Sequence, residues 1–324
     1  MSANGTLVVV RRRAPPEKHR LMGRVRRVLS TNTVVLTCTL FIVLLAALAL
    51  GVSLLPLADP TSQSALFRLK PPSPEHLLGT DRLGRDILSR ILWGARTSLT
   101  VGVGVVIVSG ALGTVLGVLA GYYRGWPSEL VLRLTDIFLA FPPLILAMVT
   151  VTVLGNSVLT VVLAISVGVV PRFARVTRAT ILSIREREYV EAVRALGASA
   201  PRIIWGHVLL NAVDPLIVLC TLLIPGAILT EALLSFLGLG IAEPTPTWGN
   251  MIQSGQIVLR EAPWLTFFPA TAIVLTVLAF NLLGDAIRDA LDPSVREGGA
   301  APSLDASLPQ KAAQRVALAA TRSR

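Results

Sequence analysis

Glu231 is the ionisable residue whose place in the sequence most suggests a function, because it lies inside an apolar run at Thr230-Glu231-Ala232. A carboxylate inside a bilayer is costly, and it usually faces a cavity or a polar partner. Glu231 is therefore a candidate for lining a pathway or for a polar contact between two helices. The alternative is that the apolar run stops earlier, so that Glu231 lies near the membrane surface.

The residue patterns of enzymes are missing from this sequence. A phosphate-binding loop has the pattern GxxxxGK[ST], but Glu, Leu or Gln precedes each of the three lysines, which are Lys18, Lys70 and Lys311. The three histidines form neither HExxH nor a metal pattern with acidic residues, and GxSxG is absent. We therefore predict no catalytic residue, metal site or bound cofactor on this chain, which is not an enzyme by itself. Any ATP chemistry must come from another chain.

Residues 184–210 predict two short helices that meet at a glycine. Tyr189, Val193 and Leu196 form an apolar stripe at helical spacing, and Gly197 is a favourable helix stop. Ser199 can cap a second helix that has Pro201 in its first turn. Such a pair is a rigid knob that could dock in a groove of a partner and transmit its movement. The alternative is an amphipathic connector that lies on the membrane surface.

The elements that must position these residues are membrane-spanning helices. Hydrophobic residues make up 53% of the 324 residues, charged residues only 15%, and the mean hydropathy is +0.68. The apolar residues come in runs that are long enough to span a bilayer, which takes roughly 20 residues. We predict an all-α polytopic membrane protein with six transmembrane helices at about 32–56, 98–121, 134–154, 158–176, 212–236 and 265–284. The spans belong to one membrane domain (31–295), preceded by a basic cytoplasmic tail (1–30) and followed by a cytoplasmic tail (296–324).

The distribution of Lys and Arg supports cytoplasmic N- and C-termini. The predicted inner segments hold 23 of these residues and the outer segments seven. The net charge of +11 is thus explained by membrane orientation, and we expect no nucleic-acid partner. The outer segment 57–97 is the exception, because its six basic residues need a separate reason and its four acidic residues offset only four of them.

Glycines recur every four residues in the second predicted span, at Gly113, Gly117 and Gly121. Small residues at this spacing form a groove where a neighbouring helix can approach closely. The alternative is the general tolerance of membrane helices for glycine.

Several segments resemble one family of transport proteins. Glu191-Ala192-Val193, followed by Gly197, is similar to the EAA motif of ABC importer permeases, although Val193 replaces the second alanine and Leu209-Leu210 replaces a Leu-Pro. Residues 78–90, 94–99, 231–240, 246–249 and 281–293 resemble the dipeptide, oligopeptide and nickel permeases of the DppC/OppC type, which are binding-protein-dependent transport inner membrane components. Glu243 stands where that pattern usually has a second proline. The resemblance covers about residues 30–295.

This resemblance implies the transmembrane domain of a type I ABC importer in the cell (inner or plasma) membrane. The permease subunit would form a heterodimer with a homologous second permease, and two ATPase subunits would carry ATP and Mg²⁺. An extracytoplasmic solute-binding protein would deliver di- or oligopeptides, or a similar small solute. The resemblance implies ATPase coupling by the helix pair, through Tyr189, Glu191, Ala192, Val193, Leu196, Gly197 and Ala198.

The outer charged residues are candidates for contact with the solute-binding protein. Four apolar residues from Ile87 to Leu92 share one helical face, so 86–97 could lie flat on the outer surface. The charged side chains beside it would then either pair with each other or contact the binding protein; they are Asp81, Arg82, Arg85 and Asp86.

Two other functions stay open. An ion-coupled secondary transporter is expected to have buried charges in several spans and often an inverted repeat, whereas this sequence has one buried carboxylate and no evident repeat. The same family also includes importers of nickel, heme or glutathione.

Overall fold

The computed structural model describes residues 32–291, so the predicted tails 1–30 and 296–324 lie outside the described residues. Helices dominate the described part, and its only β-type pairing is an isolated bridge between Thr80 and Asp86. The α-helices are α2 (Thr33–Gly51), α3 (Ile87–Tyr122), α4 (Trp126–Ala140), α5 (Pro143–Leu154), α6 (Val158–Arg185), α7 (Glu188–Ala195), α8 (Ala200–Ile203), α9 (Leu209–Phe236), α10 (Trp248–Gln256) and α11 (Trp264–Leu291). Two 3-10 helices, η1 (Val52–Leu54) and η2 (Ala65–Phe67), and a π-helix, η3 (Ile204–Val208), complete the set.

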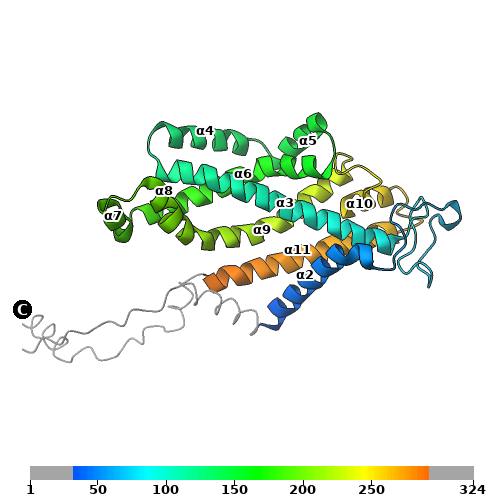
Figure 1. Cartoon of the computed structure of the whole chain (residues 1–324). Coiled ribbons are helices and arrows are strands. Elements are labelled where there is room, and N and C mark those ends of the chain that lie inside the picture. The colour runs from blue at the N-terminus through cyan, green and yellow to red at the C-terminus, as the bar shows by residue number, and fades with distance from the viewer. Residues whose placement is uncertain (1–31, 292–324) are drawn as a thin grey trace, which may run out of the picture.

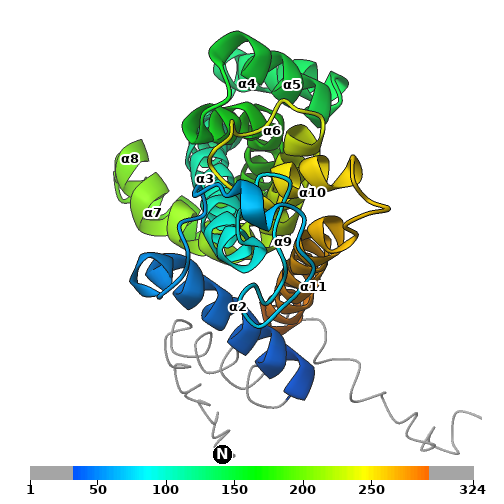
Figure 2. The ribbon, with the colours of Figure 1, turned by 90° about the vertical axis from the view of Figure 1, so that its right-hand side faces the viewer.

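The long helices form an elongated bundle (Figure 1). Viewed along the bundle, α4 and α5 lie on one side and α2 and α11 on the opposite side (Figure 2). Five helices are long and apolar enough to cross a membrane, and the count is six if the bent pair α4–α5 is one span. The expected all-α polytopic architecture is therefore confirmed.

The connecting segments gather at two opposite ends, which we call the α10 end and the α7 end (Figure 1). At the α10 end, the Trp248 indole donates to the Ile91 carbonyl oxygen at 3.0 Å, and the Ala242 amide donates to the Asn156 carbonyl oxygen at 3.1 Å. Segments predicted to share the outer side of the membrane thus lie together here. The α7 end holds the connections between α3 and α4 and between α6 and α9, which were predicted to be cytoplasmic.

Helices α3 and α6 pack most closely, along the predicted glycine groove. A Cβ atom added at Gly113 would lie 2.4 Å from the Phe173 Cβ, and one added at Gly117 would lie 2.4 Å from the Thr177 Cβ. No real Cβ tolerates such contacts, so glycine is what allows the two backbones to approach. The groove interpretation is therefore the correct one.

Helix α3 is longer than the predicted second span. Asp86 caps its first turn by accepting a hydrogen bond from the Ser89 amide at 2.8 Å, and the helix then continues for 36 residues. At 1.5 Å per residue it is about 54 Å long, well over the ~30 Å thickness of the hydrocarbon core. Residues 87–97 are thus the first turns of α3. The sequence had suggested instead that 86–97 lies flat on the outer surface, apart from the second span.

The third predicted span, 134–154, also differs from the structure. Helices α4 and α5 are bent by 91° relative to each other around Phe141 and Pro142. Consecutive prolines explain the break, since proline donates no backbone hydrogen bond and pushes the residue before it into an extended conformation. Phe141 has φ −98° and ψ 141°, as this effect requires.

Candidate functional site

The junction between α7 and α8 is a Schellman motif built on Gly197. Gly197 has φ +82°, its amide donates to the Arg194 carbonyl oxygen at 3.0 Å, and the Ala198 amide donates to the Val193 carbonyl oxygen at 3.3 Å. Glycine enters this left-handed region without the steric cost that a Cβ adds. Ser199 occupies the N-cap position of α8, as predicted, but its side chain makes no capping hydrogen bond. The predicted glycine corner is therefore present.

One face of the helix pair is anchored and the other is free. Val190 is fully buried against the inner ends of α6 and α9, where its cluster includes Ile184 of α6 and Ala212 of α9. The opposite side is exposed at Glu191, Ala192 and Gly197, and Leu196 is 87% exposed. A rigid, anchored element with an exposed Leu and an exposed Glu has the form of a docking knob, and Figure 1 shows it projecting from the α7 end.

Polar contacts tie the helix pair to the bundle. The Asn211 side-chain amide donates to the Tyr189 hydroxyl at 3.2 Å, which joins α7 to the start of α9. Arg185, the last residue of α6, donates to the carbonyl oxygens of Gly121 and Tyr122 at 3.1 and 3.0 Å. The end of α6 that leads into the helix pair is thus fixed to the end of α3.

Glu231 lies on α9 and joins it to α3. Its carboxyl group is fully buried and accepts hydrogen bonds from the hydroxyls of Ser98, at 3.2 Å, and Ser235, at 2.7 Å. Ser235 in turn accepts from the Thr247 hydroxyl at 3.4 Å, next to the start of α10. Helix α9 continues past Glu231 to Phe236, so Glu231 lies within the helix and not at its end. The geometry is that of a contact between helices.

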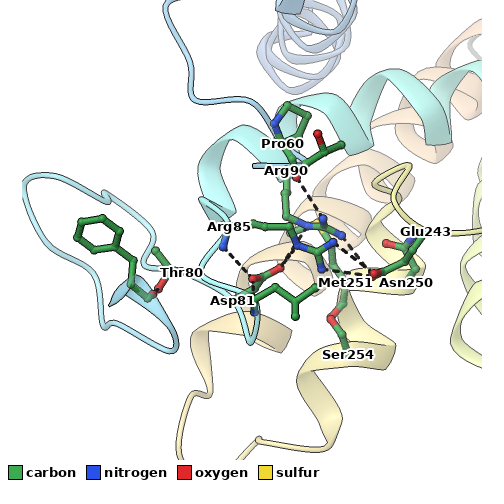
Figure 3. A network of polar contacts seen from close by, with 12 residues as sticks. Pro60, Thr80, Asp81, Arg85, Arg90, Glu243, Asn250, Met251 and Ser254 are labelled. Carbon is green, nitrogen blue, oxygen red and sulfur yellow. Dashed lines mark hydrogen bonds and ion pairs between the residues drawn. The ribbon is translucent and has the colours of Figure 1, made fainter. Parts of the chain in front are cut away.

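Four charged side chains form a closed network at the α10 end (Figure 3). The Arg85 Nε donates to Asp81 at 2.6 Å, and the two terminal nitrogens of Arg85 face the two oxygens of Glu243 at 3.2 and 3.4 Å. Arg90 lies 3.7 Å from Asp81 and 3.6 Å from Glu243, and it also donates to the Pro60 carbonyl oxygen at 3.3 Å. Asp81, Arg85 and Arg90 are buried, so only Glu243 reaches solvent.

The remaining predicted outer residues have different surroundings. Asp86 caps α3 and also lies 2.9 Å from the His76 Nδ1. Arg82 is half-buried, and its Nε has no hydrogen-bond partner in the described part of the chain. Nearby, the Thr61 hydroxyl and amide donate to Asp59 and hold the pKa of that carboxyl below its usual value.

Sequence reasoning missed two members of the network, Arg90 and Glu243. Arg90 falls within the motif at residues 78–90, and Glu243 stands where a proline is usual, so neither position by itself indicates a charge pair. One signal could have indicated Glu243. It is an acidic residue in the outer segment 238–264, and the other outer segment, 57–97, has more basic than acidic residues. No sequence pattern pairs it with Arg85, which lies 158 positions earlier.

Metal-ligating side chains do not come together within residues 32–291. No group of three or more His, Cys, Asp or Glu residues is arranged there to hold a metal ion.

Comparison with known proteins identifies what this arrangement resembles. The model of the family described as "Binding-protein-dependent transport system inner membrane component" matches residues 113–297, which is more than half of the chain. A glutathione transport system permease protein, GsiD, of Pectobacterium atrosepticum is 43% identical over 79% of this chain and 86% of its own length.

Two further relatives are named for peptide transport. A dipeptide transport system permease protein, DppC, of Alkalihalophilus pseudofirmus is 47% identical over 71% of this chain and 75% of its own length. A putative peptide transport system permease protein of Brucella suis is 40% identical over 82% of this chain and 88% of its own length.

Among solved structures, a chain of the inward-facing MetNI methionine ABC transporter aligns with 62% of this chain and 98% of its own. The sequence identity is 22% and the TM-score is 0.47.

Proposed function

We propose that this chain moves short peptides, and the premise is its family. It belongs to the binding-protein-dependent transport system inner membrane components and is the permease subunit of an ABC importer. The relatives named for dipeptides, peptides and glutathione support this substrate class, since glutathione is itself a small peptide. Nickel and heme are the alternatives within the family. The chain is a multi-pass protein of the inner membrane.

We propose that the working importer contains this permease, a homologous second permease, two ATPase subunits and an extracytoplasmic solute-binding protein. ATP and Mg²⁺ would be bound by the ATPases, and this chain would hold neither. The solute would cross between the two permeases. The α7 end would face the cytoplasm and the α10 end the outside, as the distribution of Lys and Arg predicts.

The observation that carries the coupling role is the anchored helix pair with its exposed knob. ATP binding can shift the permease between two states only if the ATPases contact those states differently. The knob supplies such a contact, because Glu191 and Leu196 face outward while Val190 is fixed in the bundle. We propose that Ala192 belongs to the same contact, since it is also exposed, and that Tyr189, Val193, Gly197 and Ala198 hold the knob in shape.

Glu231 has a supporting role in this proposal. Because its carboxyl group is enclosed by hydroxyls from α3 and α9, we propose that it joins these helices and does not touch the solute.

The test is purification of tagged permease from its native membrane in mild detergent, with Glu191→Arg in parallel. We expect the wild-type chain to bring a second permease and two ATPases. The variant should retain the second permease and lose the ATPases, because a charge of opposite sign would face their groove. Quantitative mass spectrometry of the purified material gives the ratio of subunits.

Glu186→Arg is the matched control, since it makes the same charge change at an exposed position before the pair begins. Loss of the ATPases from both variants would argue against a specific role for Glu191. A wild-type chain that purifies alone and moves peptide in vesicles without ATP would favour an ion-coupled secondary transporter. Uptake of labelled dipeptide, glutathione, nickel and heme by the reconstituted complex decides the substrate class.

A further inference from the structure

A small cavity at the α10 end has a lining that is mostly basic. It has a volume of about 260 Å³ and lies beside the charged network of Figure 3. Its lining residues are Arg68, Arg82, Leu83, Arg85, Glu243 and Ser254. Three guanidinium groups and one carboxylate leave the lining with a net charge of +2.

Only one of these guanidinium groups is neutralised from within the chain. Arg85 is bound by Asp81 and by both oxygens of Glu243. The side chains of Arg68 and Arg82 form no ion pair within residues 32–291, and the buried Nε of Arg82 has no hydrogen-bond partner there. An arginine nitrogen that is shielded from water and unpartnered carries a free-energy cost, which an incoming carboxylate would relieve.

Two exposed leucines lie in the segments that form the cavity. Leu83 is 41% exposed and lines it, and Leu66 is 83% exposed and precedes the lining residue Arg68 by two positions. The two segments are adjacent, since the Ser64 amide donates to the Leu83 carbonyl oxygen at 3.0 Å. Arginine is enriched at protein–protein interfaces, and the buried centre of an interface is more apolar than its rim.

The backbone that carries these residues is held rigidly. Gly84 has φ +74°, and a Cβ there would lie 1.9 Å from the Ser64 carbonyl oxygen, so the two segments touch as only glycine allows. The Leu69 amide donates to the Asp81 carbonyl oxygen at 3.1 Å, and the Thr80 hydroxyl donates to the Phe67 carbonyl oxygen. A preorganised surface loses little conformational entropy when a partner binds.

The predicted span of α3 places the cavity outside the hydrocarbon core. If this span begins near residue 98, the start of α3 at Ile87 stands about 16 Å outside the core at 1.5 Å per residue. Arg85, which lines the cavity, lies two residues before Ile87, and the headgroup region extends only about 5–8 Å beyond the core. This placement favours a protein partner over a lipid.

We infer that this cavity receives an acidic side chain of the extracytoplasmic solute-binding protein, with Leu66 and Leu83 packing against the surrounding surface of that protein. The inference rests on the proposed function, keeps Arg82 from the four predicted contact residues and adds Arg68. Asp81, Arg85 and Asp86 keep the surface in shape. Contact with an acidic partner also explains why the outer segment 57–97 carries more basic residues than membrane orientation requires.

The test measures how tightly the complex binds its solute-binding protein. That protein is identified beforehand as the one that stimulates ATP hydrolysis by the reconstituted complex. The complex is placed in nanodiscs, and its Kd for this protein is measured by biolayer interferometry at low and high salt. We expect Arg82→Glu to raise the Kd at least about tenfold, because the cavity would then repel a carboxylate. Leu66→Glu should weaken docking as well, and high salt should weaken docking of the wild type.

Arg260→Glu is the matched control, since it reverses an exposed charge at the α10 end outside the cavity. Its Kd should stay within about twofold of the wild type. Assembly of each variant is verified by co-purification of all subunits, and Arg82→Ala serves if Arg82→Glu does not assemble.

Two results would overturn the inference. One is an Arg82 variant that assembles and docks with the wild-type Kd. The other is unchanged docking together with loss of bound anionic lipid in native mass spectrometry, which would identify a lipid headgroup as the occupant. A wild-type complex that no solute-binding protein stimulates would instead refute the proposed function.

Discussion

Glu231 shows how one ionisable residue can be accommodated inside a membrane helix. Its carboxyl group is fully buried, and its two oxygens accept from Ser98 on α3 and Ser235 on α9. A buried polar group without partners would cost several kcal/mol in a bilayer, so the hydroxyls explain why the residue is tolerated. The same contacts make Glu231 a link between two helices that touch over much of their length.

We expect Glu231→Leu to destabilise the protein by roughly 1–3 kcal/mol, because the side chain then no longer accepts from Ser98 and Ser235. Ser98→Ala removes one partner and should cost about 1 kcal/mol. The measurement is the thermal unfolding temperature of the purified permease in detergent. The double variant should cost less than the sum of the single variants if the two groups interact. Strict additivity would mean that the hydrogen bond contributes nothing.

The close packing of helix α3 against helix α6 depends on glycine. An added Cβ at Gly117 would lie 2.7 Å from the Ala174 carbonyl oxygen as well as against Thr177, so the helices would have to separate. At Gly110, one turn before the tightest contacts, the nearest atom would be 3.5 Å away, which is an ordinary contact. The two positions lie on the same helix and differ in how closely α6 approaches.

Gly117→Ala should therefore lower stability by roughly 1–3 kcal/mol, since overpacking forces the backbones apart. Gly110→Ala is the control and should be neutral or slightly stabilising, because alanine favours the helix. Thermal unfolding in detergent and the yield of membrane-inserted protein measure both effects. Equal effects of the two substitutions would show that the groove is not what limits packing.

At the scale of elements, the sequence predicted where helices lie better than how they are joined. Apolar runs indicate that a segment can be buried in lipid, but they carry no information on direction, so the 91° bend at Phe141 and Pro142 was not anticipated. The start of α3 was separated from the second span because polar residues interrupt the apolar run there. In the structure Asp86 caps one continuous helix. The helix stop at Gly197 was predicted correctly because it depends on local backbone conformation alone.

The charged network at the α10 end could not be predicted for a different reason. Arg85 and Glu243 are distant in the sequence and meet only when the outer segment folds over the residues that follow α9. The excess of basic residues in the outer segment was visible, but their partners depend on the tertiary arrangement. The whole molecule thus decides which of these charges are structural and which remain available to a partner.

Across the whole molecule, movement of the helix pair can reach α3 through Arg185. This arginine ends α6, immediately before the helix pair, and donates to the carbonyl oxygens of Gly121 and Tyr122 at the last turn of α3. Carbonyls at a helix end lack partners within the helix, and a cation there also interacts favourably with the helix dipole. From these contacts we expect Arg185 to act as a positioning residue between the docking knob and a membrane-spanning helix.

Arg185→Gln should lower the amount of peptide transported per ATP hydrolysed by the reconstituted importer. We expect the ATPases still to co-purify, because Arg185 lies outside the knob, and we expect Arg185→Lys to restore part of the ratio. The matched control is Arg175→Gln on the same helix, which breaks an exposed ion pair with Asp136 that contributes little. A residue that merely stabilised the fold would lower transport and hydrolysis together. An unchanged ratio in Arg185→Gln would therefore show that the movement reaches α3 by another route, such as the apolar cluster around Val190.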